Sequence, residues 1–69
     1  MKTELKIGDK LKVQHSFLAT IEAHSTQKWV YKGDIIEIRR RGIFRNEYKQ
    51  YFHAPEDVIL NNCLKLDQL

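Results

Sequence analysis

Alternation of apolar and polar positions is the main structural signal along this chain. From Leu5 to Ala23 the odd positions are mostly apolar and the even positions are mostly polar or charged. A period of two over this length indicates β-strands, with breaks at "GD" and near "HS". A helix over Phe17–Ala23, capped by Ser16, is the alternative, because three apolar residues there also have helical spacing. We prefer the strands.

The middle of the chain predicts a loop at "AHSTQK" and then two strands joined by a tight turn. In "WVYKGDIIEIRR" the Gly33-Asp34 pair marks the turn. After it, Ile36 and Ile38 share one face of a strand, Arg39 and Arg41 lie on the opposite face, and Arg40 takes the inward register.

A hairpin is expected next, because "RGIFRN" contains the Gly and Asn that are typical of a hairpin tip. "EYKQYFH" then reads as the returning strand. Its alternation places Tyr48 and Phe52 on the core side and Lys49 and Tyr51 on the other. Phe44, at the tip, is expected to be exposed.

The C-terminal part predicts a short helical turn and a last strand. In "APEDVIL" Pro55 precedes two acidic residues, which is the order expected at a helix start. Leu64 and Leu66 then alternate with polar residues and with Cys63. Five or six short strands without a long helix predict an all-β fold, a small antiparallel barrel that forms a single domain over residues 1–69.

Composition limits the partners and the compartment. The chain has 69 residues, 42% of them hydrophobic and 30% charged, a formal net charge of +3 and a pI near 9.2, so a polyanion is the first partner to consider. Cys63 is the only cysteine, which excludes an internal disulfide and favours a reducing, cytoplasmic location. No apolar run approaches the roughly 20 residues needed to cross a bilayer, so we expect no membrane partner and no signal peptide.

Catalytic and metal-binding patterns are not found in the sequence. It contains no Gly-rich phosphate loop, no nucleophile elbow and no recognisable pair of catalytic acids. Its three histidines, His15, His24 and His53, are far apart, and a lone cysteine forms no Cys-x-x-Cys pair. We therefore expect neither an enzyme nor a protein with a metal or cofactor.

The clustered basic residues predict a binding surface for DNA or RNA. Arg39, Arg41, Arg45 and Lys49 would form a basic ribbon along the hairpin that contacts phosphates. Three aromatic residues could stack on bases, Trp29, Tyr31 and Tyr51. The alternative is a solvated strand whose like charges keep an edge from pairing with another chain.

A protein interface is the second functional hypothesis. Ile43 and Phe44 at the hairpin tip would be apolar anchors, and the arginines would form a polar rim that docks on an acidic protein surface. Binding to nucleic acid should weaken steeply with salt, whereas the protein interface should depend on Phe44. The sequence leaves the oligomeric state open.

Two segments resemble parts of SH3 domains. "WVYKGDIIEI" is similar to their diverging turn, and "HAPEDVIL" is similar to the helical turn before their last strand, so the resemblance covers roughly Lys10 to Leu66. The peptide-binding positions differ: "KLKVQ" replaces the aromatic "ALYDY" segment, "RRRGIFR" replaces a tryptophan pair, and Val58 replaces a tyrosine. The resemblance thus implies an SH3-like barrel without a groove for proline-rich ligands.

SH3-like barrels, including KOW modules, occur in many small bacterial, phage and ribosomal proteins that bind nucleic acid or protein surfaces. By this analogy of fold alone, the resemblance implies a small bacterial or phage accessory protein.

Overall fold

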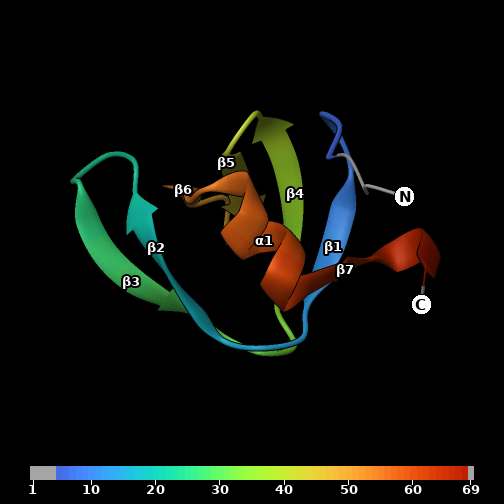
Figure 1. The fold of residues 1–69 in the computed structure, drawn as a ribbon. Helices are drawn as coiled ribbons and strands as arrows, with labels where there is room; N and C mark the ends of the chain where they lie inside the picture. The colour runs from blue at the N-terminus through green and yellow to red at the C-terminus, as the bar shows by residue number, and fades with distance from the viewer. Residues whose placement is uncertain (1–4, 69) are drawn as a thin grey trace.

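Short antiparallel strands form in the computed structural model wherever apolar and polar residues alternate, and the structure describes residues 5–68. Over these residues there are seven strands, an α-helix and a 3-10 helix: β1 (Lys10–Val13), β2 (Phe17–Ile21), β3 (Thr26–Val30), β4 (Ile35–Arg40), β5 (Ile43–Asn46), β6 (Tyr51–His53), α1 (Glu56–Asn62), β7 (Cys63–Lys65) and η1 (Leu66–Gln68). They build one curved sheet in the order β3-β2-β6-β5-β4-β1-β7 (Figure 1). The sheet is not closed, so β3 and β7 are its edges.

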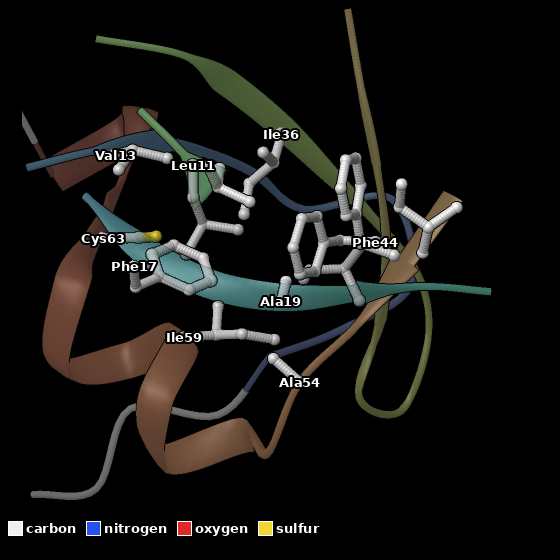
Figure 2. Packing of buried hydrophobic residues seen from close by; sticks show 13 residues of the cluster. Leu11, Val13, Phe17, Ala19, Ile36, Phe44, Ala54, Ile59 and Cys63 are labelled. Carbon is white, nitrogen blue, oxygen red and sulfur yellow. The ribbon is translucent and has the colours of Figure 1, made fainter. Parts of the chain in front are cut away.

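The core lies on the inner side of this curved sheet. Phe44 at its centre has no exposed surface, and its ring meets that of Phe17 at 6.0 Å between centroids (Figure 2). The ring of Phe44 also stacks on that of Phe52, at 5.5 Å between centroids. The other buried residues are Leu11, Val13, Ala19, Ile21, Val30, Ile36, Ile38, Ala54, Ile59 and Cys63. All of the buried side chains in this group are apolar, as expected for a core of a small domain.

Helix α1 lies across the inner side of the sheet and covers the core (Figure 1). It buries Ile59 completely, while Val58 packs partly against the same cluster. Pro55 occupies the N-cap position with two acidic residues in the first turn, as the sequence predicts. The backbone becomes extended at Cys63, where β7 begins.

Several predictions from the sequence are confirmed. Phe17–Ile21 is a strand, not a helix. Gly33 has φ +97° in the turn before β4, which favours glycine there, and Ile36 and Ile38 after it face the core. The all-β class with one short helix is therefore correct. Residues 1–4 and 69 of the predicted domain lie outside the described part, and residues 5–68 share one sheet and one core.

The predicted hairpin tip is wrong, because it merged two separate turns. Gly42, with φ +76°, turns the chain between β4 and β5, and Asn46 starts a second turn between β5 and β6. The residues between them form β5, which raises the number of strands to seven. Phe44 is thus a central strand residue and not an exposed one. Tyr48, expected in the core, is 86% exposed.

The returning strand is also shorter than expected, because the side chain of Asn46 holds a turn where the strand was predicted to begin. The Asn46 Oδ1 atom accepts hydrogen bonds from the backbone N–H groups of Tyr48 at 2.9 Å and Gln50 at 3.0 Å. Lys49 lies in this turn with φ +63°. Strand β6 starts only at Tyr51.

Two smaller corrections concern a register and a loop. The pairing of β4 with β5 shifts between Ile38 and Arg40, and the shift leaves Arg40 exposed instead of inward. The segment expected as a loop before Trp29 is partly strand, since β3 begins at Thr26.

We expect Phe44→Ala to destabilise the domain by about 3–5 kcal/mol, because it removes a ring that two other rings contact. Tyr48→Ala is the control, and it should change the free energy of unfolding by less than about 0.5 kcal/mol. Urea denaturation followed by circular dichroism measures both. Equal effects of the two substitutions would contradict this description of the core.

Cys63 should be inert to thiol reagents in the folded protein. It is 5% exposed, and burial raises the pKa of its thiol to about 12, so almost no thiolate exists near neutral pH. We expect labelling with a maleimide near pH 7 to be slow in buffer and fast in denaturant. Fast labelling without denaturant would show that β7 opens readily.

Candidate functional site

The outer face of β4, β5 and β6 carries a row of polar side chains in register. Glu37 on β4 lies opposite Arg45 on β5, and Arg45 lies opposite Tyr51 on β6. Strand β1 pairs with the other edge of β4, and there Lys10 lies opposite Glu37. Directly opposed residues in an antiparallel sheet have neighbouring side chains, so this row places charges of opposite sign and one aromatic ring side by side.

Glu37 holds two of the predicted basic residues. Its Oε1 atom accepts a hydrogen bond from Arg45 Nη2 at 2.9 Å, and its Oε2 atom accepts one from Arg39 Nη1 at 3.2 Å. The bond from Arg45, followed by that from Arg39, lowers the pKa of the Glu37 carboxyl group, and the same bond raises the pKa of Arg45. The three residues therefore form a fixed cluster with one excess positive charge.

A shallow hollow of about 360 Å³ lies beside this cluster. It is lined by Glu22, Arg39, Arg40, Ile43 and Tyr51. Glu22 reaches it because the chain stays paired with β6 past the end of β2, where Glu22 N–H donates to the Tyr51 carbonyl at 3.1 Å. Among the described residues Arg40 has no ion-pair partner, so its guanidinium group is available to an anion.

The structure brings together only part of the predicted basic ribbon. Arg39, Arg45 and Tyr51 share one face, as described above. Arg41 lies in the turn between β4 and β5, 91% exposed, with its Nε atom 3.6 Å from a carboxylate oxygen of Glu56. Lys49 lies in the turn at the other end of β5. The length of this strand, about 13 Å, therefore separates the turn that contains Lys49 from the turn that contains Arg41.

The predicted stacking residues are also divided. Tyr51 borders the hollow, but Trp29 belongs to β3, and Tyr31 follows it. Strand β2 separates β3 from β6 in the sheet. Trp29 and Tyr31 are exposed, as the alternation with buried Val30 predicts, yet they lie on a different part of the surface.

The predicted protein interface loses its main anchor. Phe44 is completely buried and cannot insert into a partner without unfolding of the core. Ile43 is half-buried and lines the hollow, as well as a second depression between Gly42 and Pro55. Burial of Phe44 therefore leaves Ile43 as the one of the two predicted anchors that is partly exposed.

Sequence reasoning missed two residues of the hollow. Alternation along the sequence predicts an inward Arg40, and only the irregular pairing at the end of β4 turns it outward. Glu22 is not predictable from its neighbours, because nothing local in the sequence shows that β2 pairs with β6. The sequence does contain one signal for the neighbouring ion pair of Glu37 and Arg39, because residues two apart in a strand share a face.

Metal-binding groups and membrane-spanning helices were two further features to look for in the described part of the chain. Within residues 5–68 no three His, Cys, Asp or Glu side chains gather in a group that could hold a metal ion. None of the helices in this part is long and apolar enough to cross a membrane.

Comparisons with protein-family models, with curated proteins and with solved structures return no match for this chain.

The cluster at Glu37 should make stability depend on acid pH. Because pairing lowers the folded-state pKa of Glu37, its contribution is full above the unfolded-state pKa of about 4.3 and is lost as the pH falls through the lower folded-state value. The melting temperature of the wild type should therefore exceed that of Glu37→Gln near pH 7, and the gap should narrow below about pH 4.

Asp67→Asn is the control for this pH dependence, because Asp67 is exposed and has no ion pair among the described residues. Its melting curve should differ little from the wild type at any pH. A gap between the wild type and Glu37→Gln that stays constant from about pH 7 to pH 3 would contradict the pairing.

Proposed function

We propose that this protein is a non-catalytic nucleic-acid-binding module that uses the outer face of β4, β5 and β6. The observation that carries this proposal is the hollow in which two arginines, Arg39 and Arg40, lie beside the ring of Tyr51. Cations beside an exposed ring suit a nucleotide, since guanidinium groups bind its phosphate and an aromatic ring stacks on its base.

The ion-pair network supports this use of the surface. Glu37 fixes the guanidinium groups of Arg39 and Arg45, so less side-chain entropy is lost when a phosphate contacts them. Arg40 adds a charge that forms no ion pair among the described residues, although Glu22 lines the same hollow. Arg41 is held only loosely by Glu56, so it can turn toward a strand of nucleic acid that leaves the hollow.

The order of elements supports the resemblance to SH3-like barrels. A first strand, a long hairpin, a Gly-Asp turn, three antiparallel strands, a helical turn and a last strand follow one another. On that ground we propose that the chain belongs to this superfamily and is a small accessory protein of a bacterium or phage. A cytoplasmic location fits its single buried thiol.

The test is the fluorescence anisotropy of labelled single-stranded DNA, duplex DNA and RNA at about 50 mM and about 150 mM salt. We expect binding that weakens with salt, and an Arg39→Ala/Arg40→Ala variant should lose about tenfold or more in affinity. The matched control is Lys28→Ala/Lys32→Ala, which removes the same charge from exposed positions at β3 and the turn after it. Equal losses in both variants would contradict this site.

Glu37→Gln should have the opposite effect from the loss of arginines. The substitution removes the charge that neutralises Arg39 and Arg45 while it keeps the size of the side chain. We expect tighter binding of nucleic acid and a salt dependence steeper by up to about one unit in slope. Asp67→Asn, with the same change in net charge, should alter affinity much less. Weaker binding by Glu37→Gln would contradict this prediction and would show that the fixed positions of Arg39 and Arg45 matter more than the charge that Glu37 neutralises.

A further inference from the structure

Strand β3 is an exposed edge of the sheet. It pairs only with β2, and its outer edge has no neighbour among the described residues (Figure 1). Four of its five residues, from Thr26 to Trp29, are exposed. An edge of this kind presents unpaired backbone groups to which another strand can bind.

The hydrogen bonds of β2 show which backbone groups β3 turns outward. In an antiparallel ladder a residue directs both its N–H and its C=O to one neighbour, and the next residue directs them to the other. Glu22 donates to Tyr51 on the β6 side, whereas the Ile21 carbonyl accepts from Ser25 on the β3 side. The backbone N–H and C=O groups of Thr20 therefore point toward β6, and those of Ala19 and Ile21 point toward β3.

The partners of these residues follow from the register. Thr26 and Lys28 lie opposite Ile21 and Ala19, so they direct their backbone groups toward β2. Gln27 and Trp29 alternate with them and direct their N–H and C=O groups to the open edge. Two residues with free donors and acceptors at strand spacing form a template for one added strand.

The side chains at this edge define what such a strand must carry. Trp29, 49% exposed, lies opposite Leu18, 44% exposed, so an apolar pair reaches the edge on the outer face. Lys28 is exposed on the opposite face, and Lys32 is exposed just beyond the strand. Neither lysine has an ion pair within residues 5–68.

We propose that the β3 edge binds an extended segment of another protein that alternates acidic and apolar residues. An apolar residue of the segment would extend the pair of Leu18 and Trp29, and an acidic residue would lie beside Lys28. The backbone groups of Gln27 and Trp29 would supply the hydrogen bonds. This proposal does not depend on binding of nucleic acid to the outer face.

A second copy of the chain is a poorer occupant of this edge. Antiparallel pairing of two β3 strands that joins Gln27 of one copy to Trp29 of the other places Lys28 directly opposite Lys28. Like charges in directly opposed positions destabilise a sheet. A lysine on an edge strand is also a known means of preventing such self-pairing.

The probe is a synthetic peptide of about eight residues that alternates Glu with Val, because a typical strand has about this length or less. Trp29 is the only tryptophan in the chain, so its fluorescence reports binding at the edge directly. We expect a saturable change in Trp29 emission. Hydrogen exchange followed by NMR should show the amides of Gln27 and Trp29 slowed by about tenfold or more on binding.

Two variants test the chemistry of the edge. Lys28→Glu should lower affinity for the acidic peptide by about tenfold and should raise it for a peptide with Lys in place of Glu. Gln27→Pro removes one outward N–H group but no bond to β2, and it should weaken binding while Trp29 remains as a reporter. Lys12→Glu, an equal change of charge on β1, is the control and should bind like the wild type.

Three results would overturn the proposal. One is the absence of any change in Trp29 emission or amide protection with either peptide. Another is unchanged affinity for a peptide that is N-methylated at alternate residues, which would show apolar capture without strand pairing. The third is protection of the Gln27 and Trp29 amides that rises with protein concentration without peptide, because a second copy would then occupy the edge.

Discussion

Contacts among the rings of Phe17, Phe44 and Phe52 hold together three strands from different parts of the chain. Phe17 comes from β2, Phe44 from β5 and Phe52 from β6, and the rings meet with centroids 5.5 to 6.0 Å apart. A domain of this size buries little apolar surface, so each large ring supplies a considerable share of its stability. The curvature of the sheet and the position of α1 both follow from the need to enclose these rings.

The same constraint determines which residues can act on the outside. Because side chains alternate along a strand, burial of Phe44 forces Ile43 and Arg45 outward, and burial of Phe52 does the same for Tyr51. The register of β5 and β6 that stacks Phe44 on Phe52 also places Arg45 opposite Tyr51. The register of β4 and β5 in turn pairs Ile38 with Phe44 in the core and Glu37 with Arg45 outside. The same strand alternation and register that bury the core side chains thus also position the outer row of charges.

The alternation of residues in the sequence was sufficient to predict most of the fold. It predicted the strand at Phe17, the turn at Gly33, the inward isoleucines of β4 and the helical turn after Pro55, because each is dictated by residues close together in the chain. It failed between Gly42 and Asn46. Two turn-forming residues only four positions apart looked like one turn, and burial of Phe44 between them depends on contacts with distant strands.

The candidate site was less predictable than the fold, for a related reason. The sequence shows clustered arginines but not their ion pairs, since Glu37 meets Arg45 only through strand pairing and Glu56 reaches Arg41 from a helix. Arg40 turns outward because of an irregular register that no local pattern indicates. Charge clustering therefore overestimated the number of cations free to bind, since Arg39, Arg41 and Arg45 each have a carboxylate partner.

The two proposed surfaces can act independently under physiological conditions. A strand added at β3 extends the sheet sideways and does not cover the outer face of β5, which lies three strand positions away in the sheet, or about 14 Å. This separation exceeds the Debye length of about 8 Å at physiological ionic strength, so acidic residues beside Lys28 would be largely screened from a phosphate near Arg40. At low salt the screening length grows past this separation, and an acidic strand at β3 would then oppose binding of a polyanion at the hollow.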